Sequence, residues 1–191
     1  MGETFKPAAF TIKSNNGLLR ELITPIGVSL HIGGRIMGDD PRVHQTTALW
    51  DTGATNSVIT PSIVNALGLK PTGMREAHHA GGTSLVNTYL INIYLPNRLT
   101  VSGIKVTECA DSVGNFGLII GMDIISLGDF AFTNVNGKSI FSFRLPSSKA
   151  IDYVKEQDDA DLYKARSIEQ NQLCLCGSGK KFKDCHGKGQ I

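Results

Sequence analysis

The sequence has little net charge, few aromatic residues and no long hydrophobic run. Its 19 basic and 17 acidic side chains leave a net charge of +2 over 191 residues, which argues against a dedicated nucleic-acid-binding protein. Aromatic residues make up only 7% of the chain while Gly occurs 21 times, and this balance favours strands and turns over a helical bundle. The 41% of hydrophobic residues are nevertheless enough to form a core, which excludes general disorder.

Membrane-spanning and secretory signals are also lacking. The longest apolar stretch, residues 116–132, is broken by glycines and aspartates and is too short and too polar to cross a bilayer. The N-terminal residues contain no apolar run of the kind that forms a signal peptide. Three of the four cysteines fall within residues 174–185, a cluster more typical of metal binding in a reducing compartment than of a disulfide framework. We therefore expect a cytoplasmic protein without a transmembrane segment.

Charge and cysteine content divide the chain into unequal parts. Residues 171–191 hold four of the 19 basic side chains and one of the 17 acidic ones, so this tail carries +3 and the rest of the chain −1. We predict a main domain over residues 1–146, a charged helical linker over residues 147–172 and a small metal-binding motif over residues 173–191. The linker helix is expected to begin at Ser147 or Ser148 and to reach about Gln170. It is interpreted as a solvated spacer, with docking to a partner as the alternative.

The main domain reads as mainly β. Short alternating or β-branched runs predict strands at residues 26–32, 87–95 and 101–106. Asn136-Gly137 between two apolar runs predicts a hairpin over residues 130–143, because these two residue types suit the positive-φ positions of a type I′ turn. Short helices are expected after Pro61, ending at Gly68, and over residues 124–127.

One tripeptide of this domain suggests chemistry. In residues 48–60, Asp51-Thr52-Gly53 lies between apolar segments, so a tight turn would present the Asp51 carboxylate at the end of a strand. Gly53 would allow another backbone to approach the carboxylate closely, and the Thr52 hydroxyl is available for a hydrogen bond to a partner strand. Taken alone, the tripeptide fits an ordinary turn at the end of a strand equally well.

Two further motifs follow the Asp-Thr-Gly turn in the sequence. Residues 116–123 form a second apolar segment that ends in Gly-Met-Asp, and the Gly81-Gly82 pair lies between the two. In this order the three motifs resemble the retropepsins, the retroviral-type aspartic proteases, and their bacterial relatives. The resemblance covers about residues 10–146. It implies a closed, mainly antiparallel β fold, a catalytic aspartate at Asp51, and a strand of the second segment that crosses behind the catalytic turn.

The same resemblance leaves two points open. Gly81 and Gly82 would belong to a flap that closes over the substrate, although an ordinary hairpin turn explains these glycines equally well. Asn56 stands where many viral members have Asp, so the hydrogen-bonding network beside the catalytic turn is expected to differ from theirs.

The number of Asp-Thr-Gly turns predicts the assembly. Hydrolysis of this kind uses two carboxylates that share a proton, one acting as base and the other as acid. The chain has one Asp-Thr-Gly, and neither Asp123 nor Asp129 lies in a comparable turn. We therefore predict a homodimer in which Asp51 of each subunit faces the other across a two-fold axis.

The tail predicts a zinc site. Cys174, Cys176, Cys185 and His186 supply three thiolates and one imidazole, a set that suits tetrahedral Zn²⁺ in a structural role. A tail of about twenty residues buries too little apolar surface to fold without such an ion. The stretch closely resembles the SEC-C motif of the preprotein translocase ATPase. That resemblance implies docking to an acidic protein partner, for which Lys180, Lys181 and Lys183 would supply the positive charge.

Together these features predict an aspartic endopeptidase, bacterial by its combination of motifs, that hydrolyses peptide bonds as a homodimer. Its tail would recruit substrates or partners, and no nucleic acid is expected. One alternative is a non-proteolytic dimerisation or peptide-binding module with an adaptor tail. In another alternative the tail carries the principal function, and dimerisation of the main domain presents two tails together.

Overall fold

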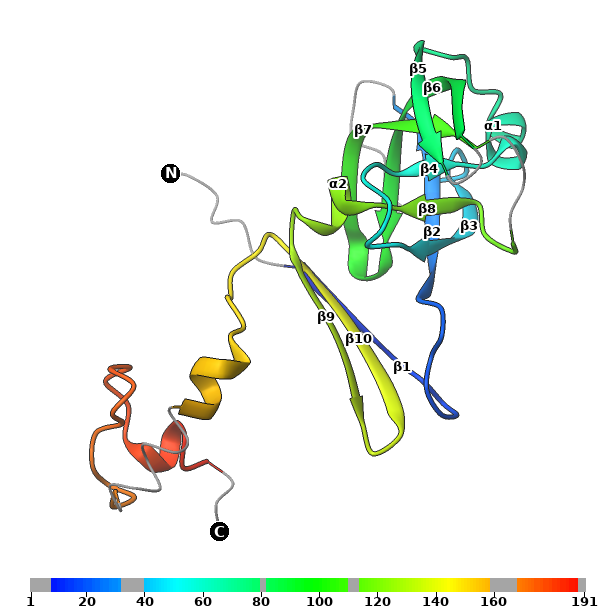
Figure 1. Cartoon of the computed structure of the whole chain (residues 1–191). Helices are drawn as coiled ribbons and strands as arrows, with labels where there is room; N and C mark the ends of the chain where they lie inside the picture. The colour runs from blue at the N-terminus through cyan, green and yellow to red at the C-terminus, as the bar shows by residue number, and fades with distance from the viewer. Residues whose placement is uncertain (1–7, 32–39, 80–81, 110–113, 159–167, 189–191) are drawn as a thin grey trace. The chain divides into compact units, whose positions relative to one another are not determined.

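A computed structural model describes residues 8–31, 40–79, 82–109, 114–158 and 168–188. The chain forms two compact units, Met1–Ser148 and Lys149–Ile191, hereafter unit 1 and unit 2 (Figure 1). Unit 1 is mainly β, as the composition predicts. Every helix of the described residues falls short of the length and apolarity that a membrane-spanning segment requires.

A seven-stranded sheet forms the body of unit 1, with the strand order β2-β3-β8-β4-β7-β6-β5. A further pairing between β2 and β6 closes this sheet on itself. Most pairings are antiparallel, as expected, but β8 runs parallel to β3 and β4 runs parallel to β7. The strands span Ile23–Leu30 (β2), His44–Trp50 (β3), Val58–Ile59 (β4), Gly73–His79 (β5), Gly82–Leu95 (β6), Leu99–Glu108 (β7) and Leu118–Ile120 (β8).

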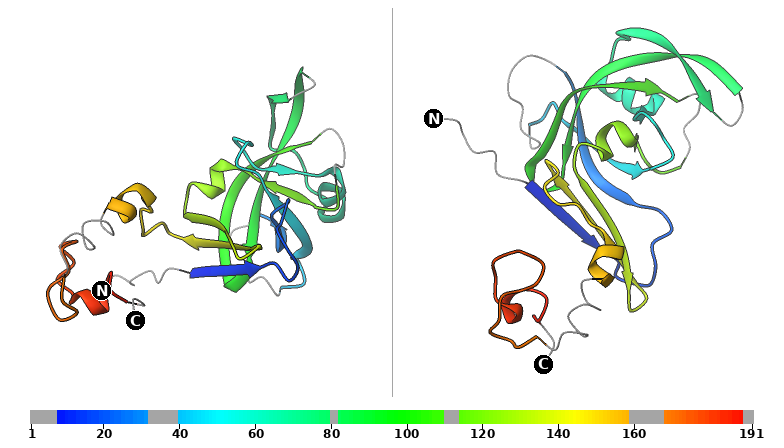
Figure 2. Two further views of the ribbon diagram at one scale, coloured as in Figure 1. Left: turned by 60° about the horizontal axis from the view of Figure 1, so that its bottom comes forward. Right: turned by 60° about the vertical axis from the view of Figure 1, so that its left-hand side comes forward.

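A second sheet of three antiparallel strands has the order β1-β10-β9. It contains β1 (Ala8–Lys13), β9 (Asp129–Val135) and β10 (Lys138–Leu145). Figure 2 shows β1 lying along the β9–β10 hairpin, to one side of the closed sheet. The predicted hairpin turn is confirmed, because both turn residues have positive φ, 54° at Asn136 and 72° at Gly137.

The helices of unit 1 are short and follow the predicted positions. Helix α1 spans Pro61–Leu67 and ends at Gly68, which has a φ of 60°. Helix α2 spans Met122–Ile125, and a single 3₁₀ turn, η1, spans Pro96–Arg98. Each α-helix buries two apolar side chains: Ile63 and Val64 for α1, Ile124 and Ile125 for α2.

Aromatic packing joins the two sheets around Trp50, the only tryptophan. The Trp50 ring lies 4.9 Å from the Phe143 ring and 5.1 Å from the Phe141 ring, measured between centroids. Its Nε1–H donates a 2.9 Å hydrogen bond to the Thr24 hydroxyl, so the one polar atom of this buried side chain is satisfied. Trp50 immediately precedes Asp51, and this cluster therefore fixes the end of β3 from which Asp51 emerges.

The predicted linker helix is wrong at both ends, because residues 147–152 and 168–170 are not helical. Ser147 and Ser148 bond to the Asp129 carboxylate instead of starting a helix, the first through its hydroxyl and the second through its N–H at 3.0 Å. Helical structure begins only at residues 153–158, where Asp152 Oδ1 accepts the Lys155 N–H at 3.0 Å. As a helix cap the serine oxygen would accept a backbone N–H, whereas here Ser147 and Ser148 donate to a carboxylate, and such charge-assisted hydrogen bonds are the stronger kind. Residues 159–167 of the predicted helix lie outside the described residues.

Asp129 makes the stability of unit 1 sensitive to acid. Its carboxylate also accepts the Nε–H of Arg144 at 2.8 Å, and the bonds from Ser147, Ser148 and Arg144 hold its pKa well below its usual value. A carboxyl whose pKa is lower in the folded state stabilises that state above the unfolded pKa of about 3.9, and the effect disappears as the pH falls. Replacement by Asn is therefore expected to lower the melting temperature of unit 1 at neutral pH. As the pH falls below about 4, the melting temperature of the variant should then decrease less than that of the wild type.

Thermal unfolding followed by Trp50 fluorescence between neutral and acidic pH measures this effect. Asp152→Asn is the matched control, because Asp152 lies in unit 2 and is expected to leave the Trp50 transition unchanged. Parallel pH profiles for the wild type and the Asp129→Asn variant would contradict the role given to Asp129.

Candidate active site and metal centre

Asp51 emerges from the closed sheet on a turn that connects β3 to β4. Its backbone N–H donates to Ile120 O at 2.9 Å, its carboxylate Oδ1 accepts the Gly53 N–H at 2.8 Å, and its carbonyl accepts the Ala54 N–H at 3.2 Å. Thr52 and Gly53 are exposed and Asp51 is half-buried. The turn therefore presents the carboxylate at the surface while its backbone is tied to β8, as a tight turn at Asp-Thr-Gly predicts.

Strand β8 lies between the two strands that the turn connects. Residues 118–120 pair in parallel with β3 on one side, and residues 118–119 pair antiparallel with β4 on the other. A Cβ at Gly121, just after β8, would lie 2.7 Å from Asn56 C and 2.8 Å from Ala54 O, both backbone atoms of the turn. Only glycine permits so close an approach of residue 121 to the backbone of the turn. The second apolar segment thus crosses behind the Asp51 turn, as expected.

A row of half-buried apolar side chains shares the face of the sheet on which Asp51 lies. Leu49 pairs with Ile119, and Ile119 pairs with Val58, so these three side chains stand side by side across three strands. Asp51 is two residues beyond Leu49, and alternation along the strand places it on the same face, opposite to buried Trp50. These side chains therefore form an apolar surface beside the Asp51 turn.

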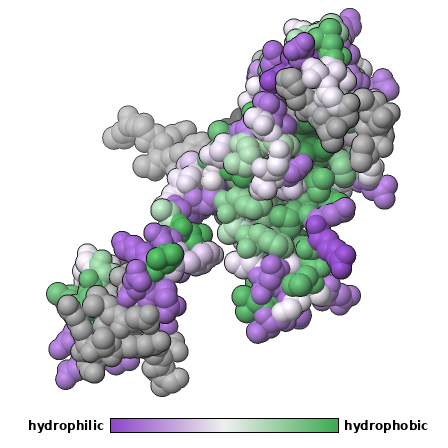
Figure 3. Space-filling model, in the orientation of Figure 1, coloured by the Kyte–Doolittle hydropathy of each residue, from purple (hydrophilic) through white to green (hydrophobic). Residues whose placement is uncertain are grey.

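Apolar surface also surrounds the turn. Met122 and Leu127, on and just after α2, are 38% and 44% exposed although both are apolar. In Figure 3, apolar residues gather across the middle of unit 1, around α2 and β8. Met122 N–H donates to Ala54 O at 2.8 Å, which places this exposed side chain directly beside the Asp51 turn.

The expected flap is only partly described. Strands β5 and β6 form a hairpin at the opposite end of unit 1 from the β9–β10 hairpin (Figure 1). Gly82 begins β6, pairs with His79 and has a φ of 122°, whereas Gly81 lies outside the described residues. The structure therefore places Gly82 at the end of the hairpin, and the role of Gly81 and Gly82 as a lid stays a prediction.

Two residues of the site escaped the sequence analysis. Ser57 is fully buried, and its hydroxyl donates to Asp123 Oδ1 at 2.7 Å while its N–H donates to Asp123 Oδ2 at 2.9 Å. Asp123 was considered only as a second carboxylate for catalysis. The local sequence holds no signal for this pair, because 66 residues separate its members.

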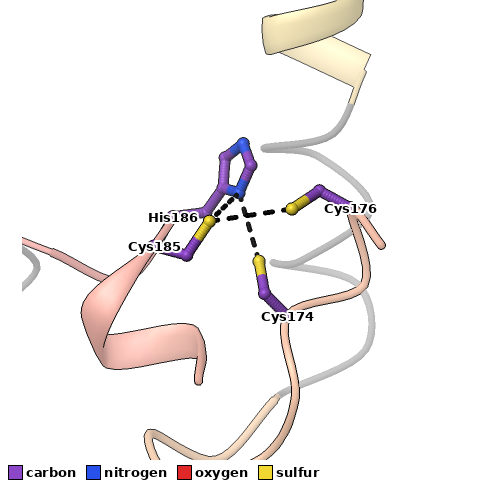
Figure 4. A group of neighbouring side chains, drawn as sticks. All are labelled: Cys174, Cys176, Cys185 and His186. Atoms are coloured by element: carbon purple, nitrogen blue, oxygen red, sulfur yellow. Dashed lines mark hydrogen bonds between the residues drawn. The ribbon is translucent and has the colours of Figure 1, made fainter. Parts of the chain in front are cut away.

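In unit 2 the four predicted ligands converge. Figure 4 shows the side chains of Cys174, Cys176, Cys185 and His186 pointing toward one another. Their ligand atoms all lie within 4.8 Å of one another, with 3.6 Å between the sulfurs of Cys176 and Cys185 and 3.2 Å between Cys174 Sγ and His186 Nδ1. A tetrahedral zinc with Zn–S bonds of about 2.3 Å requires sulfurs about 3.8 Å apart, so the cluster can hold such an ion.

Backbone contacts assemble this cluster from two short segments. Cys174 N–H donates to Lys180 O at 2.7 Å, and Phe182 N–H donates to Gln172 O at 2.8 Å. The 3₁₀ turn η2, Phe182–Asp184, then brings Cys185 and His186 back to the first two cysteines. Phe182 is buried against Cys174 and covers the cluster.

Among the pKa shifts of these ligands, only that of Cys176 favours the form that binds metal. Hydrogen bonds from the side chain and backbone of Ser178 lower the pKa of the Cys176 thiol and favour the thiolate, which is the form that binds metal. The hydrogen bond with Cys174 raises the pKa of His186, and a metal ion would displace the shared proton.

Comparison with known proteins supports both resemblances. Residues 42–127 match the family model of the gag-polyprotein putative aspartyl protease, and residues 171–188 match the SEC-C motif. The protein translocase subunit SecA of Campylobacter concisus is 42% identical over 41 residues, which are 22% of this chain. The chain spans only 5% of the length of that relative.

Solved structures similar to this chain include three of retroviral or retropepsin type. A retropepsin-like aspartic protease from Rickettsia conorii has a TM-score of 0.46 at 11% identity, over 75% of this chain and 99% of that one. The EIAV protease in complex with the inhibitor HBY-793 has a TM-score of 0.40 at 17% identity, over 59% and 92%. The retroviral protease-like domain of Ddi1 from Leishmania major has a TM-score of 0.38 at 16% identity, over 70% and 100%.

Proposed function

We propose that the protein is an aspartic endopeptidase that acts as a homodimer, with one Asp51 from each subunit. The observation that carries this proposal is the Asp51 turn, which presents a carboxylate at the surface of a segment that matches the aspartyl protease family. Asp123 and Asp129 bond to Ser57 and to Arg144, Ser147 and Ser148, so neither is available as a second carboxylate. A second copy of the chain then supplies the missing partner.

In the proposed reaction a water molecule lies between the two Asp51 carboxylates. One carboxylate takes a proton from this water as it attacks the peptide carbonyl, and the other, protonated, donates to the carbonyl oxygen. Two like charges this close do not both ionise, so the pair titrates as a coupled unit. Gly53 orients each carboxylate through its N–H, and the exposed Thr52 hydroxyl would bond to the partner subunit.

The substrate would be an extended peptide that crosses both subunits. On each side its apolar side chains would lie against the row formed by Leu49, Ile119 and Val58, beside Asp51. The β5–β6 hairpin, which Gly82 ends in the described residues, would close over the peptide and exclude water, and Gly81 and Gly82 would form this flap. The exposed apolar side chains of Met122 and Leu127 lie where a second subunit would cover them.

For unit 2 we propose a structural zinc ion held by Cys174, Cys176, Cys185 and His186, with no part in catalysis. Three exposed lysines follow Cys176, and they would recruit an acidic partner or substrate to the protease. These lysines are Lys180, Lys181 and Lys183.

Dimerisation tests this proposal directly. Because each active site needs two chains, the cleavage rate of a peptide library is expected to rise with the square of protein concentration below the dimer dissociation constant, and linearly above it. Sedimentation at the same concentrations should show the dimer forming over the same range. A stable monomer with full activity would overturn the shared site, and a stable dimer that cleaves nothing would favour the peptide-binding alternative.

A further inference from the structure

Residues 120–123 hold most of the backbone of the Asp51 turn, and one further main-chain hydrogen bond runs from Thr107 N–H to Ser57 O at 3.3 Å. Ile120 O accepts the Asp51 N–H at 2.9 Å, as described above. Met122 N–H donates to Ala54 O at 2.8 Å, and Asp123 N–H donates to Thr55 O at 3.2 Å. The beginning and the middle of the turn are thus fixed by main-chain hydrogen bonds to three residues of this segment.

The end of the turn is fixed differently, by the side chains of Ser57 and Asp123. Both carboxylate oxygens of Asp123 accept hydrogen bonds from Ser57, one from its hydroxyl and one from its N–H. The Ser57 hydroxyl in turn accepts the Gly121 N–H at 3.1 Å. Ser57 is fully buried, so the loss of Asp123 would leave its N–H and hydroxyl without their protein partner.

We propose that Asp123 and Ser57 are positioning residues that set the place of the Asp51 carboxylate. Asp51 and Ser57 are the two ends of the turn, and the same short segment holds both of them. A shift of Ser57 therefore moves the turn relative to β8, and with it the carboxylate that must meet its counterpart from the other subunit. This inference rests on the proposed peptidase function, and it gives Asp123 a role other than that of a second acid.

Substitutions at Asp123 separate positioning from charge. Asp123→Ala removes both acceptors and leaves the Ser57 N–H and hydroxyl without their partner. Asp123→Asn keeps two contacts without the charge: its oxygen can accept the Ser57 N–H and its amide can donate to the Ser57 hydroxyl oxygen, so that only the hydroxyl hydrogen loses its acceptor. The matched control is Ser126→Ala, which removes a 2.6 Å hydrogen bond within the same helix, to Met122 O, that does not reach the turn.

Steady-state kinetics on the full-length protein measure the effect on catalysis. Asp123→Ala and Ser57→Ala are expected to lower kcat by about 10- to 100-fold with KM little changed, since a displaced carboxylate impairs the chemical step more than peptide binding. Asp123→Asn is expected to restore most of the rate, and Ser126→Ala to match the wild type. Equal kcat for Asp123→Ala and the wild type would overturn the proposal, as would an Asn variant as impaired as the Ala variant.

Amide hydrogen exchange tests the positioning role independently of activity. In Asp123→Ala, exchange is expected to accelerate at the amides of Gly53, Ala54 and Ser57 but not in β1 or β10, and Asp123→Asn should restore protection. Unchanged exchange at the turn would refute the positioning role whether or not the protein cleaves peptides. If the wild-type dimer cleaves no peptide while the turn responds as expected, the proposed peptidase function fails and the structural role of the pair stands.

Discussion

Replacement of Asp51 by Asn is expected to reduce peptide cleavage by about 10⁴-fold. An amide cannot take a proton from water, and general acid–base catalysis contributes about 10²- to 10⁴-fold for each proton transfer that is lost. The fold should survive, because the Asn oxygen can still accept the Gly53 N–H that now bonds to Asp51 Oδ1. The dimer should survive as well, since two uncharged Asn side chains can still hydrogen-bond to each other across the two-fold axis.

Cleavage of a diverse peptide library by wild type and variant, between mildly acidic and neutral pH, measures this loss. Asp40→Asn is the matched control: it makes the same chemical change at a carboxylate that bonds to Arg42 and lies outside the Asp51 turn. Full activity is expected for the control. Activity of the Asp51→Asn variant within a few-fold of the wild type would refute the assignment of Asp51.

A mixing experiment tests whether both subunits contribute. When wild type and an equal amount of the Asp51→Asn variant exchange subunits at random, about one quarter of the dimers carry two aspartates. Activity per wild-type chain is then expected to fall to about half, whereas an active site within one chain would leave it unchanged. The result separates a shared active site from two independent ones.

The second large effect is expected in unit 2 on removal of its metal. One zinc ion per chain is expected in the purified protein, and a strong chelator or the Cys185→Ser substitution should unfold residues 168–188. The core of this unit is small, with Cys174 and Phe182 as its buried apolar residues among those described. Zinc binding by small Cys/His domains releases about 10–16 kcal/mol, which exceeds what so small a core can supply.

Metal analysis together with hydrogen exchange measures this effect. Cys109→Ser is the matched control, because Cys109 lies in unit 1, outside the cluster, and its loss should leave the zinc content at one per chain. Unit 1 is expected to keep its Trp50 fluorescence transition after chelation. Full zinc stoichiometry in the Cys185→Ser variant, or in protein that lacks residues 171–191, would show that the ion is held elsewhere.

The parts of the structure that the sequence predicted correctly depend on neighbours in the chain. The Asn136-Gly137 turn follows from the backbone preferences of two residues, and helix α1 follows from Pro61, the apolar spacing and Gly68. The metal cluster is equally local, since its four ligands lie within 13 consecutive residues. In each case the interactions that decide the structure are formed within a short loop, whose closure costs little conformational entropy.

The predicted start of the linker helix is wrong because a distant residue intervened. Ser147 and Ser148 are good helix caps by type, and nothing nearby in the sequence competes for their hydrogen bonds. In the structure they lie beside Asp129, which β9 and β10 bring close. A propensity for capping amounts to about 1 kcal/mol, and hydrogen bonds to a carboxylate are at least as strong.

The sequence by itself determined the chemistry available to this protein: one carboxylate at an Asp-Thr-Gly turn, three thiols and an imidazole in the tail, and a mainly β main domain. Only the tertiary structure decided how that carboxylate is held. Strand β8 enters between β3 and β4, and Asp123 reaches back to Ser57 across 66 residues. Such contacts depend on the register of strands that are distant in the chain, and this register is fixed by packing of the whole core rather than by any local pattern.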